Sequence, residues 1–115
     1  MKLSEQQRQI ISHFFADKPV LRAYVFGSYA RGDADEKSDI DLLIDWDYTQ
    51  HIGWGYVSAW RDLKEKLNKD VDFVSVKWMD PSLEEAIHRE KQLIYEMPSL
   101  RQQEEPVLKD TGHSL

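Results

Sequence analysis

Apolar positions recur along this 115-residue chain with two different periods, which predict helices and strands in alternation. Apolar residues three and four positions apart indicate the apolar stripe of a helix, whereas short β-branched or alternating runs indicate strands. The expected helices cover residues 4–16, 54–68 and 81–91. The expected strands cover residues 21–26, 39–46, 70–76 and 92–96.

Local signals mark several ends of these elements. Ser4, with Gln7 three positions later, has the pattern of a capping box at the start of the first helix. Asp80 followed by Pro81 predicts an N-cap and a first helical position. The polar residues 28–38 indicate a turn, a short helical piece and a loop between two strands.

The second strand has two chemically different faces, because successive side chains of a strand point to opposite sides. One face carries Ile40, Leu42, Ile44 and Trp46, and the other carries Asp39, Asp41, Leu43 and Asp45. The order of elements is helix, strand, turn, strand, helix, strand, helix, strand. It predicts an α/β (α+β) fold in which helices flank a mixed β-sheet.

The chain length fits one domain. We assign residues 1–97 to it. Beyond Met97 the sequence offers few apolar anchors and many Gln, Glu and Pro residues, so residues 98–115 are expected to form a disordered tail.

Composition narrows the classes of protein that fit. The absence of cysteine excludes disulfides and thiolate metal sites, and no apolar run approaches the roughly 20 residues of a membrane-spanning helix. The N-terminus lacks the apolar core of a signal peptide, so we expect a cytoplasmic protein without membrane contact. The net charge of −6 disfavours stable nucleic-acid binding by this chain alone, but it is compatible with a basic partner protein.

Three carboxylates suggest a metal site. Asp39 and Asp41, two positions apart on a strand, would share one face and repel each other, which cations would relieve. Mg²⁺ prefers such oxygen ligands together with substrate phosphates. Asp72 on the next strand is placed to complete a two-metal site, with Asp70 as a rival. The alternative is that these carboxylates only solvate the exposed face of an edge strand.

The pair Gly27-Ser28 closes the first strand and suggests a phosphate site. A strand that turns at once into a helical piece exposes backbone N–H groups, which bind phosphate oxygens well. Ser28 adds a hydroxyl donor, and Arg31 is expected to contact a phosphate or to brace the loop. Taken alone, Gly27-Ser28 is equally consistent with an ordinary strand-to-helix turn.

Other polar and aromatic residues carry weaker signals. The four histidines show no metal-ligand spacing, and the four tryptophans are expected in the core or at interfaces more than against a base. Glu84, Glu85, Arg89 and Glu90 are interpreted as a solvated helix face.

The combination is more specific than its parts. Gly27-Ser28, ten residues, and then Asp39-x-Asp41 resembles the signature of the polymerase β-like nucleotidyltransferase superfamily. The fuller run Gly-Ser-Tyr-Ala-Arg-Gly at 27–32 resembles its minimal nucleotidyltransferase (MNT) members, and the likeness extends over residues 21–96. It implies the nucleotidyltransferase fold.

The resemblance also implies roles for the residues. In that family the Gly-Ser pair binds the triphosphate, so Gly27 and Ser28, with Arg31 nearby, are expected to bind the nucleotide. Asp39 and Asp41 are expected to bind two Mg²⁺ ions, with Asp72 sharing a metal and acting as the general base. The substrate expected as donor is ATP, and the expected activity is transfer of a nucleoside monophosphate to a hydroxyl group.

Small MNT proteins are similar to the antitoxins of two-gene modules whose toxin is a HEPN ribonuclease. The resemblance implies a protein adenylyltransferase that transfers AMP to a tyrosine of such a toxin (AMPylation). Two alternatives remain open at this point. One is a non-catalytic antitoxin that neutralises its partner by binding, and the other is a nucleotidyltransferase acting on a small molecule such as an aminoglycoside.

Overall fold

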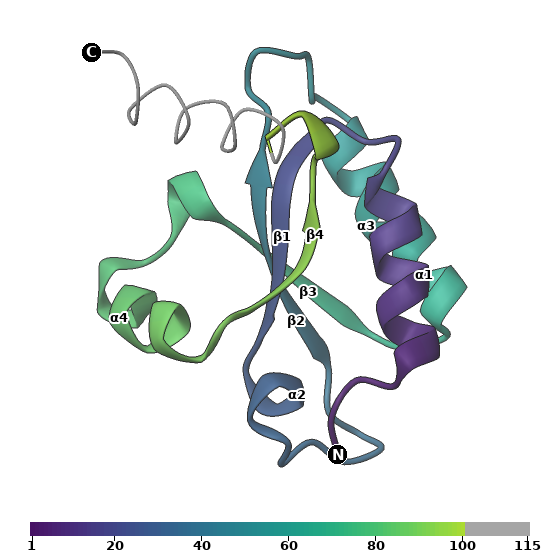
Figure 1. Cartoon of the computed structure of the whole chain (residues 1–115), viewed down its shortest axis with the longest axis vertical. Helices are drawn as coiled ribbons and strands as arrows, with labels where there is room; N and C mark the ends of the chain where they lie inside the picture. Colours follow the sequence, from purple (N-terminus) through teal and green to yellow (C-terminus); the bar gives the residue numbers. More distant parts are fainter. Residues whose placement is uncertain (101–115) are drawn as a thin grey trace, which may run out of the picture.

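The computed structural model describes residues 1–100. In it, a four-stranded sheet has helices on both sides (Figure 1). In chain order its elements are α1 (Glu5–Phe15), β1 (Val20–Phe26), α2 (Ser28–Arg31), β2 (Ile40–Trp46), α3 (Gly55–Leu67), β3 (Val71–Ser75), the 3₁₀ turn η1 (Val76–Trp78), α4 (Pro81–Glu90) and β4 (Gln92–Glu96). This is the order that the sequence predicts, except that η1 was not expected and takes Val76 from the predicted strand. The expected tail lies almost entirely outside the described residues and stays a prediction.

The sheet is mixed, as the sequence predicts. Its strand order is β3-β2-β1-β4. Strand β1 pairs antiparallel with both β2 and β4, whereas β2 and β3 run parallel. Helix α3 makes the crossover that a parallel pair requires.

Helices α1 and α3 lie side by side over one face of the sheet (Figure 1). The alternating residues Ile40, Leu42 and Ile44 of β2 are fully buried in this main core. Phe15 of α1 and Leu63 of α3 are fully buried opposite them. Each fully buried side chain of this size contributes about 1.5–3 kcal/mol, so this layer holds the fold together.

Helix α4 lies on the other side of the sheet and touches the rest of the fold at few points (Figure 1). Its one buried residue is Ile87, which lies outside the main core cluster, as does the buried Leu43 of β2. Because Leu43 shares a strand face with Asp41 and Asp45, these two carboxylates are on the side of α4, away from α1 and α3. The candidate site is therefore on this second face.

The predicted caps are confirmed. The Ser4 hydroxyl accepts the Gln7 N–H at 3.0 Å, and the Gln7 side chain accepts the Ser4 N–H at 2.9 Å. The Asp80 carboxylate accepts the N–H of Ser82 at 2.9 Å, with Pro81 at the first helical position. Such caps define where a helix begins, because they satisfy N–H groups that the helix itself leaves unpaired.

Strand β3 is one of the two edge strands of the sheet, and two side chains of α3 bond to its backbone. The Trp60 indole N–H donates to the Val71 carbonyl at 2.7 Å, and the Tyr56 hydroxyl donates to the Phe73 carbonyl at 3.2 Å. Both carbonyls point away from β2 and are thereby satisfied within the chain. Within residues 1–100, no helix is long and apolar enough to cross a bilayer.

Candidate active site

The turn at Gly27 joins β1 to the short helix α2. Gly27 has φ +71°, a left-handed conformation that side chains with a β-carbon rarely adopt. Its carbonyl accepts the N–H groups of Ala30 and Arg31, both at 3.0 Å. These bonds leave the N–H groups of Ser28 and Tyr29 without an acceptor among residues 1–100. The turn thus leaves two amide donors unpaired beside the Ser28 hydroxyl, where Ser28 is partly exposed and Tyr29 is buried.

The carboxylate of Asp41 lies directly against this turn. Phe26, the last residue of β1, is paired with Asp41 of β2 in the antiparallel register. A β-carbon built on Gly27 would collide with the Asp41 Oδ2 atom. Glycine at position 27 is therefore required twice, by its backbone conformation and by the close approach of a carboxylate.

Asp72 is the direct neighbour of Asp41 across the sheet. The parallel register of β2 and β3 pairs Asp41 with Asp72. In-register residues of neighbouring strands point to the same face, so both side chains are on the side of α4. The structure brings together Gly27, which follows β1, Asp41 of β2 and Asp72 of β3.

Asp39 is placed differently from the expectation. Strand β2 begins at Ile40, one residue later than predicted, and Asp39 is an exposed residue of the preceding loop. The alternation of side chains along a strand therefore does not determine the direction in which the Asp39 side chain points. Its negative charge still acts on the carboxyl group of Asp41.

The pKa of Asp41 is raised to about 6. The main cause is partial burial of the carboxyl group, and repulsion from Asp72 and then from Asp39 adds to it. The positive charge of Arg31 acts in the opposite direction. This part of the molecule therefore carries negative charge that its own cations do not balance.

All three candidate metal ligands offer carboxylate oxygens, the donor type that suits Mg²⁺. In the described part of the chain, no three Asp, Glu, His or Cys side chains are gathered closely enough to hold a metal ion. The donor chemistry and the excess negative charge fit a divalent cation, and the ligand set stays a prediction.

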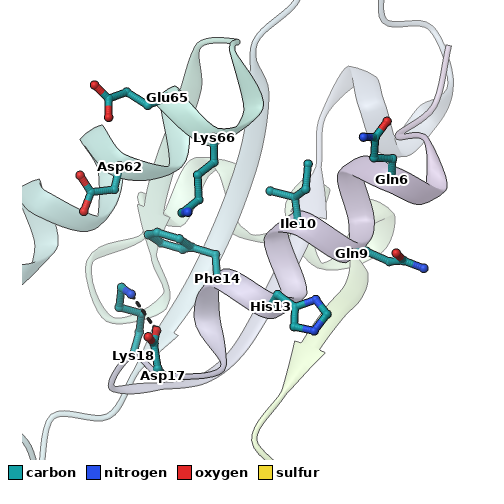
Figure 2. A pocket seen from close by; sticks show the side chains of 10 residues that line it. All are labelled: Gln6, Gln9, Ile10, His13, Phe14, Asp17, Lys18, Asp62, Glu65 and Lys66. Carbon is teal, nitrogen blue, oxygen red and sulfur yellow. Dashed lines mark hydrogen bonds and ion pairs between the residues drawn. The ribbon is translucent and has the colours of Figure 1, made fainter.

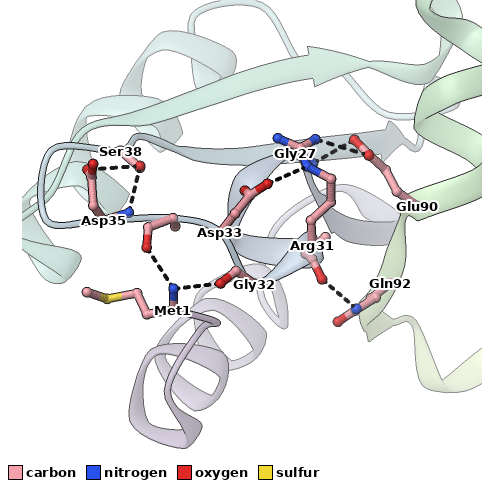
Figure 3. Close-up of polar contacts among 11 residues, drawn as sticks. Met1, Gly27, Arg31, Gly32, Asp33, Asp35, Ser38, Glu90 and Gln92 are labelled. Carbon is pink, nitrogen blue, oxygen red and sulfur yellow. Dashed lines mark hydrogen bonds and ion pairs between the residues drawn. The ribbon is translucent and has the colours of Figure 1, made fainter.

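Arg31 braces the turn through two ion pairs (Figure 3). Its guanidinium contacts Asp33 at 3.1 Å and Glu90 at 3.1 Å. Glu90 also accepts the Gly27 N–H at 2.9 Å, so one carboxylate of α4 holds two groups of the turn. The interpretation of Glu90 as part of a solvated helix face was wrong. Its partners lie about 60 residues earlier in the sequence, and no local pattern indicates them.

Asp70, the rival for the third carboxylate, is engaged elsewhere. It precedes β3, and its side chain is largely exposed and contacts Lys64 at 3.4 Å. Its carbonyl accepts the Ile40 N–H at 3.0 Å, which extends the β2–β3 pairing by one bond. Its position favours a structural role and leaves Asp72 as the better candidate.

Two hollows of the surface do not contain the three aspartates. A groove of about 750 Å³ between α1 and α3 is lined mainly by polar side chains, among them His13, Asp62 and Lys66 (Figure 2). An apolar pocket of about 490 Å³ includes Trp46 and Trp78. The Trp46 indole nitrogen, though buried, has no hydrogen-bond partner among the described residues. Neither hollow brings the free amides together with the carboxylates, so neither is the candidate active site.

Known proteins are similar to this chain in sequence and in fold. The family described as "Polymerase beta, Nucleotidyltransferase" matches residues 8–99. A protein from Methanocaldococcus jannaschii, named as a candidate protein adenylyltransferase, is 34% identical over 90 residues, which cover 78% of this chain and 95% of that protein. A second protein of that organism, with the same kind of name, is 34% identical over 73 residues, covering 62% of this chain and 71% of the relative.

A solved structure shares the fold at lower sequence identity. The crystal structure of a toxin–antitoxin with AMP-PNP matches with a TM-score of 0.67 at 18% identity, covering 90% of this chain and 97% of that one. A complex of a tri-AMPylated HEPN toxin with an MNT antitoxin, from Shewanella oneidensis, contains a second match. There the TM-score is 0.64 at 18% identity, and the coverage is 97% of this chain and 85% of that one. These similarities show that this chain has the same fold as the matched chains.

Proposed function

Because this chain belongs to the polymerase β nucleotidyltransferase family, we propose that it transfers AMP from ATP to a hydroxyl group of a partner protein. We further propose that the acceptor is a tyrosine of a HEPN-type ribonuclease toxin and that the chain acts as its antitoxin. The observation that carries the transfer activity is the meeting of the Gly27 turn with Asp41 and Asp72. Free amide donors and paired carboxylates at one place suit a triphosphate and its counter-ions.

The turn would bind the phosphates of the donor nucleotide. The free N–H groups of Ser28 and Tyr29 and the Ser28 hydroxyl are donors for phosphate oxygens. Arg31 adds positive charge next to them, although Asp33 and Glu90 neutralise most of it. The residues of the turn thus orient the nucleotide more than they neutralise it.

Asp39, Asp41 and Asp72 would hold two Mg²⁺ ions, in keeping with their oxygen donors and the excess negative charge around Asp41. When bound, Mg²⁺ would supply positive charge that neutralises the phosphates and the departing pyrophosphate. Without it, the repulsion among these carboxylates would extend to the triphosphate, and the site would bind the nucleotide poorly.

Asp72 is the group we assign as general base. It is the exposed member of the Asp41–Asp72 pair, so an acceptor hydroxyl can reach it from solvent. The acceptor oxygen would form a bond to the α-phosphorus while the bond from that phosphorus to pyrophosphate breaks. Asp72 would take the hydroxyl proton.

The choice of a protein acceptor has a separate basis. The relatives from M. jannaschii are named for protein adenylyltransferase activity. The S. oneidensis complex pairs its MNT antitoxin with a HEPN toxin that carries AMP groups. The net charge of −6 also suits a basic, RNA-cutting partner.

A transfer assay tests this function. The full chain is incubated with Mg²⁺, ATP labelled at the α-phosphate and lysate of its source, beside Asp41→Asn and the exposed control Asp62→Asn. We expect one labelled protein with the wild type and with Asp62→Asn, no label with Asp41→Asn, and the AMP group on a tyrosine by mass spectrometry.

Other results of this assay would contradict the proposal in distinct ways. Label found on an added aminoglycoside would identify a small-molecule acceptor. Retained ATP binding with no labelled product would identify an antitoxin that acts by contact. Equal labelling by wild type and Asp41→Asn would exclude the assigned carboxylates.

A further inference from the structure

Glu90 is the last residue of α4 and the place where that helix touches the turn (Figure 3). One carboxylate oxygen accepts the Gly27 N–H at 2.9 Å, and the other contacts the Arg31 guanidinium at 3.1 Å. The side chain is largely covered, with 23% of its surface exposed. A charged group held in this way makes stronger hydrogen bonds than a neutral one.

A second contact ties the same segment to α2. The Gln92 amide donates to the Ala30 carbonyl at 3.1 Å, and the Gln92 oxygen accepts from Arg8 of α1 at 3.0 Å. Glu90 at the end of α4 and Gln92 at the start of β4 therefore contact both ends of α2. The turn is fixed from outside by side chains that lie far along the chain.

The distribution of N–H groups shows what this bracing does. The Glu90 carboxylate accepts the Gly27 N–H, and the Gly27 carbonyl accepts the N–H groups of Ala30 and Arg31. The amides left over are those of Ser28 and Tyr29, which are next to each other at the start of α2. The contact with Glu90 thus decides which donors of the turn remain available.

The negative charge of Glu90 is otherwise out of place. It adds an anion to the part of the molecule that already carries Asp41. A purely electrostatic phosphate site would exclude such a group. The contacts of Glu90 with Gly27 and Arg31 explain why an anion lies here. The hydrogen bonds of Glu90 hold the turn in one conformation, and Arg31 balances the charge of Glu90.

We propose that Glu90 is a positioning residue of the nucleotide site, which fixes the Gly27 turn so that the Ser28 and Tyr29 N–H groups are presented to a phosphate. This inference rests on the proposed nucleotide-transfer function. Glu90 acts through Gly27 and Arg31 and does not touch the reacting atoms.

Three variants separate this role from others. Glu90→Ala removes both contacts, whereas Glu90→Gln keeps an oxygen that can accept the Gly27 N–H. Glu85→Ala, on the exposed surface of the same helix, is the matched control. Binding of the non-hydrolysable analogue AMP-CPP with Mg²⁺ is measured by calorimetry, and exchange of the Gly27 amide hydrogen is measured by NMR.

The expected results follow from the loss of a charge-assisted hydrogen bond. Glu90→Ala should weaken AMP-CPP binding about tenfold and remove the protection of the Gly27 amide. Glu90→Gln should restore most of the affinity, and Glu85→Ala should match the wild type. In turnover assays the KM for ATP should rise more than kcat falls, because the turn holds the substrate rather than the acceptor.

Two outcomes would overturn the inference. If folded Glu90→Ala binds AMP-CPP as tightly as the wild type or more tightly, Glu90 is either irrelevant or a competing anion. If the Gly27 amide stays protected in Glu90→Ala, the contact does not hold the turn. A wild type that binds no nucleotide while Glu90→Ala still loses amide protection would refute the proposed function and leave the positioning of Gly27 by Glu90 intact.

Discussion

The backbone of Gly27 lies so close to Asp41 that a β-carbon at position 27 would collide with the Asp41 Oδ2 atom. This contact joins the turn after β1 to the carboxylate of β2 and sets the spacing between the candidate phosphate donors and the candidate metal ligand. Any side chain at position 27 must therefore move one of the two.

Gly27→Ala is expected to abolish transfer activity and to destabilise the protein. Alanine at φ +71° and ψ −152° costs of order 1–3 kcal/mol, and the collision with Asp41 adds to this cost. Gly55→Ala is the control, because a β-carbon there meets no atom within 4 Å and the residue begins a regular helix. Chemical denaturation should show Gly55→Ala to be as stable as the wild type or more so. Full activity of Gly27→Ala would contradict the assignment of the turn.

Asp41→Asn is expected to stabilise the metal-free protein above neutral pH. The pKa of Asp41 is about 6 in the native state, whereas the ordinary value, which applies to the unfolded chain, is 3.8. Burial and the neighbouring Asp72 and Asp39 disfavour the charged form in the native state. The native state thus binds more protons than the unfolded chain between these values, and stability falls as the pH rises through this window.

The Asp41→Asn variant removes this pH-dependent loss of stability. At pH 7.5 without metal, Asp41→Asn should be more stable than the wild type on the order of 1 kcal/mol, a value kept low by solvent around the partly exposed carboxyl group. The difference should vanish below about pH 4, where both side chains are neutral. Thermal unfolding from pH 3.5 to 8 measures it, with Asp62→Asn as control. An Asp41→Asn curve parallel to that of the wild type would show that Asp41 is not electrostatically strained.

Mg²⁺ with AMP-CPP is expected to reverse that order of stability. A ligand at 100 times its dissociation constant stabilises the native state by about 2.7 kcal/mol. The wild type should gain this stabilisation, whereas Asp41→Asn and Asp72→Asn should gain little of it. A chelator should abolish both the thermal shift and the transfer activity, and added Mg²⁺ should restore them. An equal thermal shift in all three proteins would place the metal elsewhere.

Ile87→Ala is expected to lower both stability and nucleotide affinity. Ile87 is the one buried residue of α4, and truncation of a buried Ile costs about 2–5 kcal/mol. Because α4 also carries Glu90, a loosened helix should weaken the hold on Gly27. Leu83→Ala, at an exposed position of the same helix, should change stability by less than about 0.5 kcal/mol. Wild-type affinity for AMP-CPP in folded Ile87→Ala would show that the turn is independent of α4.

The order of elements could be predicted because each has a strong local signal. The capping box of Ser4 and Gln7, the Asp80-Pro81 pair and the alternation from Ile40 to Trp46 are all short-range patterns, and the structure confirms them. The place of Asp39 shows where local reasoning fails. Alternation predicts a strand residue there, whereas the β2–β3 pairing begins at Ile40 and Val71.

The site divides in the same way between local and distant information. The short spacing from Gly27 to Asp41 carries the motif, and the family match agrees with it. The contact of Glu90 with Gly27 spans 63 positions and depends on how α4 packs on the sheet. No periodicity within α4 distinguishes Glu90 from the exposed Glu84 and Glu85, so only the folded structure assigns it.

The covered edge of β3 limits how an acceptor can approach. Since Trp60 and Tyr56 occupy the outward carbonyls of Val71 and Phe73, a partner cannot add an extended strand beside Asp72 without displacing both. If Asp72 is the base of the proposed transfer, an acceptor side chain reaches it without backbone pairing to β3. Binding of an acceptor should then be unaffected by whether its backbone can form a β-strand.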